Sequence, residues 1–135
     1  MPTSRQADAS GATRQRPRHS GGWWGMALLL AAVIAWGSLM PASELPEDLP
    51  WDKANHLLAY AGLAALVALA CDRAWLSVGL AVGYGVLIEL AQIPVPGRLG
   101  GDPWDMLANT LGALLGVLLV CQCRRLWRRR LWRGC

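Results

Sequence analysis

Four long runs of apolar residues set the strongest limit on how this chain can fold. The runs are Trp23–Met40, Ala54–Cys71, Trp75–Ile93 and Trp104–Cys123, with short polar links between them. A chain of 135 residues cannot bury that much continuous apolar sequence in a soluble core. Each run has close to the roughly 20 residues that cross the hydrocarbon core of a bilayer. Because the apolar residues do not alternate with polar ones, we expect membrane-spanning helices and not the strands of a barrel.

The predicted fold is therefore all-α, a four-helix transmembrane bundle formed by residues 23–123. Residues 1–22 are polar, rich in arginine and without apolar periodicity, which predicts a disordered basic tail. Residues 124–135 are a second basic tail, whose arginines suit the anionic headgroups of a membrane surface. The first run is long for the core of a signal peptide and lacks a good small-x-small cleavage site, so we expect it to remain as the first span.

Basic residues are distributed so that the orientation of the bundle can be predicted. With four spans, both tails and the link that contains Arg73 lie on one side of the membrane. That side carries every basic residue of the chain except Lys53 and Arg98. By the positive-inside rule it is the cytoplasmic side, so both termini are predicted inside and two loops outside.

Composition also limits the partners. The net charge of +4 does not indicate a nucleic-acid partner, because topology and anionic lipids explain arginine-rich tails beside membrane helices. The expected partner is the lipid bilayer.

The cysteines lie at or near the predicted cytoplasmic face, which predicts reduced thiols without a structural disulfide. Cys121 and Cys123 lack the spacing of a zinc site.

Ionisable and amide side chains gather near the predicted outer ends of the last three spans. Because a charged group in lipid costs free energy, such residues indicate a functional site or internal pairing. Asp52, His56 and Tyr60 follow one another at intervals of four residues, which places them on one face of a helix. Inward-facing stripes of this kind predict a polar pocket that opens to the outer surface. The complete set is Asp52, Lys53, His56, Tyr60, Glu89, Gln92, Arg98, Asp102, Asp105 and Asn109.

Small residues predict which helix faces approach one another. Gly112 and Gly116 form a small-xxx-small pattern in the fourth run, and Gly79 and Gly83 form one in the third. Such faces let membrane helices pack closely.

Each polar residue also has a structural interpretation. Asp102 precedes a proline and is a favourable N-cap for the fourth helix, and Asp52 can cap the second helix in the same way. Glu89 can form an ion pair with Arg98 or with Lys53, which would make its role purely structural.

Three segments carry a family resemblance: "DKANHLLAYAGL", "YGVLIELAQIPVPGR" and "DMLANTLGALLG". In this order and at one membrane face, they resemble the VanZ-like membrane proteins, small bacterial proteins named after a teicoplanin-resistance accessory factor. The resemblance covers about residues 50 to 120. It implies a multi-pass protein of the bacterial inner (plasma) membrane, with a link to glycopeptide resistance. The matching residues are Asp52, Lys53, His56, Tyr84, Gly85, Glu89, Gln92, Pro96, Gly97, Arg98, Asp105, Asn109 and Gly112.

The favoured function is an outward-facing pocket that binds an anionic amphiphile, such as a lipid-linked or glycopeptide ligand. Lysine and arginine bind phosphate and carboxylate groups, and the apolar walls below would hold an acyl or prenyl chain. The residues assigned to binding are Asp52, Lys53, Tyr60, Gln92, Arg98 and Asn109.

Two other functions remain open. One is a membrane-embedded hydrolase or transferase that acts on a lipid phosphate or ester, with His56 and Glu89 as acid and base and with Asp105 beside them. Alternatively, His56 and Glu89 can hold a divalent ion together with Asp52 and Asp105, but a single histidine weakens a zinc site, so we expect no metal and no cofactor. The other is a structural subunit of an envelope complex.

Overall fold

The computed structural model describes residues 20–44 and 52–133. The described residues form four α-helices: α1 (Ser20–Leu39), α2 (Asp52–Cys71), α3 (Ala74–Gln92) and α4 (Pro103–Arg133), with a short 3-10 segment at Ala42–Glu44. All four helices are long and apolar enough to cross a membrane. Each covers one of the predicted apolar runs except for Met40 and Ile93, which directly follow α1 and α3, so the prediction of an all-α four-helix bundle is confirmed.

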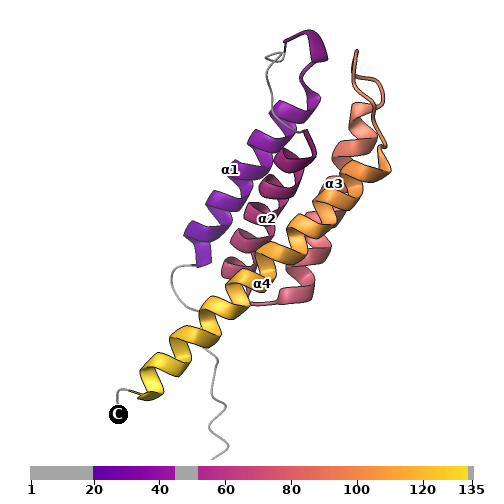
Figure 1. Ribbon diagram of the computed structural model, residues 1–135. Coiled ribbons are helices and arrows are strands. Elements are labelled where there is room, and N and C mark those ends of the chain that lie inside the picture. Colours follow the sequence, from indigo (N-terminus) through magenta and orange to yellow (C-terminus); the bar gives the residue numbers. More distant parts are fainter. Residues whose placement is uncertain (1–19, 45–51, 134–135) are drawn as a thin grey trace, which may run out of the picture.

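The ends of the bundle differ from the predicted ends at both termini. α1 begins at Ser20, so residues 20–22 of the predicted tail are helical, while residues 1–19 lie outside the described part. α4 continues without a break beyond Cys123 to Arg133 and extends past the other helices (Figure 1). Arginine, leucine and glutamine are good helix formers, and neither glycine nor proline interrupts this stretch.

The four helices run side by side, with α2 in contact with each of the others (Figure 1). α2 packs most extensively against α4, whereas α1 packs mainly on α2 and touches α3. The last turns of α1 and α3 meet the first turns of α2 and α4 at one end of the bundle, which we call the polar end. The polar side chains that were singled out in the sequence and that the structure describes lie at this end.

Contact between α2 and α4 depends on two glycines. A Cβ atom at Gly112 would collide with the carbonyl oxygen of Leu57, and one at Gly116 with the carbonyl oxygen of Ala61. The backbones of the two helices therefore approach as closely as the sequence pattern predicted. Buried alanine and valine side chains, such as Ala64 and Ala113, complete this interface.

The corresponding prediction for α3 is wrong. Gly79 and Gly83 are exposed, and a Cβ atom at either would meet nothing within 4 Å among the described residues. α3 instead turns the face with Ser77, Ala81 and Gly85 toward its neighbours. This face also carries the polar residues at the end of α3, and their burial outweighs the packing that the other two glycines allow.

Candidate functional site

Glu89 is the most deeply buried acidic residue of the polar end, with 0% of its surface exposed. Its Oε2 atom accepts hydrogen bonds from the backbone amides of Gly101 (3.1 Å) and Asp102 (3.2 Å). These amides directly precede α4, where the helix dipole favours negative charge. The other oxygen, Oε1, is buried and has no hydrogen-bond partner among the described residues.

The loop between α3 and α4 can present these amides because of Gly100. A Cβ atom at Gly100 would collide with the backbone of Gln92 and Ile93, so the loop passes directly over the end of α3. Gly101 follows with a φ of 79°, a left-handed conformation that favours glycine. Sequence reasoning missed the two amides, although a glycine pair before an Asp-Pro helix start was a signal for a close backbone approach.

His56, on α2, is held by Asn109, on α4. The Nδ1 atom of His56 lies 3.1 Å from Oδ1 of Asn109, and both side chains are buried. Because an amide oxygen only accepts hydrogen bonds, Nδ1 is the donor in this contact. The Nδ2 atom of Asn109 has no partner within the part of the chain that the structure describes.

Asp105, one turn before Asn109, is also buried and pairs with Lys53. The Nζ atom of Lys53 lies 3.3 Å from Oδ1 of Asp105 and 3.4 Å from Oδ2 of Asp102. Asp102 also accepts a hydrogen bond from the amide of Trp104 at 2.8 Å, which confirms its predicted role as N-cap of α4. The Trp104 amide, followed by Lys53, lowers the pKa of Asp102. Asp52 starts α2, but its side chain lies outside the described structure.

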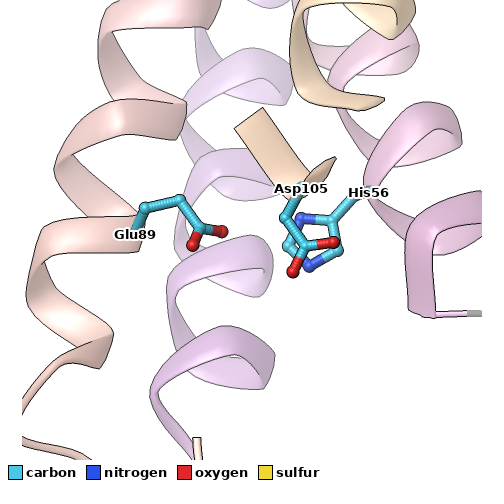
Figure 2. Close-up of side chains that lie close together, drawn as sticks. All are labelled: His56, Glu89 and Asp105. Carbon is cyan, nitrogen blue, oxygen red and sulfur yellow. The ribbon is translucent and has the colours of Figure 1, made fainter. Parts of the chain in front are cut away.

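His56, Glu89 and Asp105 come together from three different helices. One nitrogen or oxygen atom of each lies within 4.8 Å of the other two, and all three residues are buried. Figure 2 shows the two carboxylates turned toward the imidazole ring. We call these three residues the buried cluster. The sequence had assigned them to the same chemical role, and the fold places them where they can share a proton, a substrate or an ion.

Tyr60, one turn after His56 on α2, packs against the imidazole ring of His56. Its ring stacks on the imidazole with centroids 6.4 Å apart and planes 9° apart. The residue is fully buried, and its hydroxyl group has no hydrogen-bond partner among the residues described. Gly85 makes room for it, since a Cβ atom there would lie 3.1 Å from the Tyr60 ring and 3.0 Å from Nδ2 of Asn109.

Arg98 and Gln92 bind the C-terminal end of α1. Arg98 donates hydrogen bonds to the carbonyl oxygens of Gly37 (2.7 Å) and Met40 (3.1 Å), and Gln92 donates to that of Ser38 (2.9 Å). The last carbonyls of a helix have no partner within the helix, so these side chains cap α1. Both residues had been assigned to ligand binding from sequence.

The structural alternative for Glu89, an ion pair with Arg98 or Lys53, is not formed. Lys53 pairs instead with Asp102 and Asp105, and Glu89 and Arg98 both bind backbone groups. The carbonyls of α1 bind the Arg98 guanidinium, and the backbone before α4 binds the Glu89 carboxylate. Backbone groups at a helix end therefore bind the Arg98 guanidinium and one oxygen of the Glu89 carboxylate.

A pocket of about 300 Å³ lies beside the buried cluster, between α1 and α2. Asn55, His56 and Arg98 line one part of it, and Leu30 and Val33 of α1 line another. His56 belongs to both the pocket and the buried cluster. Sequence reasoning missed Asn55, although it is a polar residue in the first turn of a span next to His56.

A protein-family model described as VanZ/LLP1 matches residues 19–127, which include all the residues of the buried cluster and of the pocket. No curated protein and no solved structure matches the chain.

Proposed function

The chain belongs to the VanZ/LLP1 family, and on that premise we propose that it binds an anionic amphiphile at the polar end of a membrane bundle. The pocket of about 300 Å³ carries the proposal. Its lining changes from the polar side chains of Asn55, His56 and Arg98 to the apolar side chains of Leu30 and Val33. An amphiphile has the same change along its length, and small-molecule sites combine apolar walls with a few polar groups.

Arg98 is the natural partner of an anionic group. A guanidinium has more N–H donors than the carbonyls of Gly37 and Met40 occupy, so further donors serve a phosphate or carboxylate. The two carbonyls also hold the guanidinium in place, which reduces the entropy that binding would otherwise cost. Lipid-linked wall precursors, phospholipids and lipidated glycopeptides all combine an anionic group with an apolar chain.

The binding proposal is tested with pocket-filling variants of the full chain in lipid nanodiscs. Val33→Trp places a bulky ring in the pocket, whereas Leu29→Trp puts the same ring on an exposed part of α1 that does not line it. We expect Val33→Trp to weaken binding of a labelled polyprenyl phosphate or of teicoplanin by about tenfold, the effect of roughly 1.4 kcal/mol. Equal binding by the two variants would contradict the proposal.

The pocket also offers a route to glycopeptide resistance. We expect overproduction in a bacterial host to reduce sensitivity to teicoplanin, and Val33→Trp to remove this effect at an unchanged protein level. If overproduced Val33→Trp still reduced teicoplanin sensitivity, the pocket would not be the cause of resistance. This role assumes that the protein lies in the inner membrane with its polar end outward, as the arginine distribution predicts.

The buried cluster favours an enzyme as the second candidate. The imidazole of His56 and the carboxylates of Glu89 and Asp105 form a potential acid–base set that is shielded from water. Such a set can activate a water molecule for attack on a lipid phosphate or ester. Release of product from labelled phospholipid or polyprenyl phosphate, lost in His56→Ala, would favour this candidate over binding alone.

A further inference from the structure

Three buried polar atoms at the polar end lack a hydrogen-bond partner among the described residues. They are Oη of Tyr60, Oε1 of Glu89 and Nδ2 of Asn109. A buried polar atom without a partner is unfavourable, and a carboxylate oxygen is the most unfavourable case because it carries charge. A group that binds at Glu89 would remove the largest of these penalties.

We propose that His56, Glu89 and Asp105 bind a divalent metal ion. One potential ligand atom from each residue lies within 4.8 Å of the other two. Ligand atoms that lie about 2.0–2.2 Å from one ion are up to roughly 4 Å apart, so small side-chain rotations complete the geometry. The carboxylates of α3 and α4 already turn toward the ring of His56 on α2 (Figure 2).

Hydrogen bonds orient two of the three ligands as they do in known metal sites. His56 donates its Nδ1 proton to the amide oxygen of Asn109, and we assign coordination of the metal ion to its other ring nitrogen, Nε2. A histidine that binds a metal ion usually donates its other ring N–H to an oxygen in this way. Glu89 is anchored through Oε2 by two backbone amides, and its unpartnered Oε1 is the coordinating oxygen.

Charge balance also favours a divalent cation. Glu89, Asp102 and Asp105 bring three carboxylates to the polar end, and Lys53 is the cation that pairs with two of them. Of the two buried carboxylates, Asp105 pairs with Lys53, whereas Glu89 has no cation as an ion-pair partner among the described residues. A buried carboxylate without a cation is costly in a region of low dielectric constant. Lys53 binds Oδ1 of Asp105, so the second oxygen of that carboxylate serves the ion.

The ligands indicate which ion binds. One imidazole and two carboxylates suit a first-row ion such as Mn²⁺ or Zn²⁺ better than Mg²⁺, which prefers oxygen ligands. Three protein ligands also leave positions open for water or for a bound substrate oxygen. This site goes beyond the amphiphile-binding proposal. It shares only His56 with the pocket, whose lining includes neither Glu89 nor Asp105, so its metal binding can be measured separately.

The test uses the full chain, purified in detergent, stripped with chelator and titrated with MnCl₂ or ZnCl₂. We expect about one ion bound per chain, and binding at least tenfold weaker in His56→Ala and Glu89→Gln; Asn109→Ala should weaken it about tenfold, as loss of an outer hydrogen bond does. Asp72→Asn, which removes a carboxylate at the opposite end, is the matched control and should bind as the unchanged protein does.

Spectroscopy separates loss of a ligand from loss of fold. In the Mn²⁺-loaded protein, electron spin echoes should show coupling to a bound imidazole nitrogen, and Asp105→Asn should keep this coupling while it weakens binding. The proposal is overturned if the unchanged protein binds neither ion saturably, or if His56→Ala leaves affinity and nitrogen coupling unaltered. Either result leaves amphiphile binding to be judged by its own assay.

Discussion

Glu89, at the end of α3, accepts a hydrogen bond from the backbone amide of Gly101, just before α4, with 3.1 Å between Oε2 and the nitrogen. This bond connects two membrane helices through a loop whose course requires a glycine at position 100. It also turns the carboxylate toward His56 and Asp105. One contact therefore connects the path of the backbone to the chemistry of the polar end.

Removal of the Glu89 carboxylate should destabilise the bundle. Glu89→Leu leaves the half-buried amides of Gly101 and Asp102 without this acceptor, at about 1 kcal/mol for each, the lower end of the range for an unpaired buried donor. Glu89→Gln keeps an acceptor oxygen and should cost less than half as much. Thermal unfolding in detergent, with chelator present to remove metal effects, measures the difference. Equal losses of stability in Glu89→Leu and Glu89→Gln would show that the hydrogen bonds from the two amides to Glu89 do not stabilise the fold.

Close packing of α2 and α4 predicts opposite results for two identical substitutions. Gly112→Ala forces a methyl group against the Leu57 carbonyl and should destabilise the protein by about 1–3 kcal/mol, as overpacking does. Gly83→Ala, on the exposed face of α3, should be neutral or slightly stabilising because alanine favours helix. Thermal unfolding midpoints provide the comparison. A destabilising Gly83→Ala would mean that this face has a partner.

The N-cap of α4 predicts a loss of stability in acid. The folded-state pKa of Asp102 lies below its ordinary value of 3.8, because the Trp104 amide and then Lys53 favour the carboxylate. The contribution of the Asp102 carboxylate to the free energy of unfolding is therefore complete above pH 3.8. It is lost as the pH falls through the lowered folded-state pKa. Asp102→Asn keeps a capping oxygen but not the charge, so its unfolding midpoint should fall less between pH 5 and pH 2. An identical decline in both proteins would exclude Asp102 as the cause.

The turn between α2 and α3 makes a prediction for the opposite end of the bundle. Asp72 has a φ of 57° and forms an ion pair with Arg124 of α4. Asp72→Asn loses the ion pair but tolerates this backbone conformation, so it should cost at most about 1 kcal/mol. Asp72→Val should cost more, because a β-branched residue strains the left-handed conformation. The thermal unfolding midpoint should therefore be lower for Asp72→Val than for Asp72→Asn, and equal midpoints would contradict the prediction.

The orientation of the bundle can be checked with a reporter. A green fluorescent protein fused after Cys135 should fluoresce and an alkaline phosphatase at the same position should be inactive, since both termini are predicted in the cytoplasm. The same reporters inserted at Ser43, in the loop after α1, should show the reverse pattern. Reversed activities would place the polar end in the cytoplasm.

Local information was enough to predict the number of spans, their approximate limits, the common depth of the polar residues and the N-cap at Asp102. Apolar length and capping depend on residues close together in the chain, so each can be read from a short segment. The α2–α4 contact was also predictable, because Gly112 and Gly116 lie on the same helix face as Asp105 and Asn109.

Only the tertiary structure decided which groups the charged side chains bind, because that depends on how the helices are rotated and on the course of the loops. Sequence patterns left an ion pair of Glu89 open and favoured close packing at Gly79 and Gly83, and neither is formed. Gly100 brings backbone amides to Glu89, while the end of α1 takes Arg98. Almost every residue type has the same backbone donor and acceptor, so the sequence does not show which side chain binds the backbone at a helix end. The packing of the helices and loops in the tertiary structure decides that.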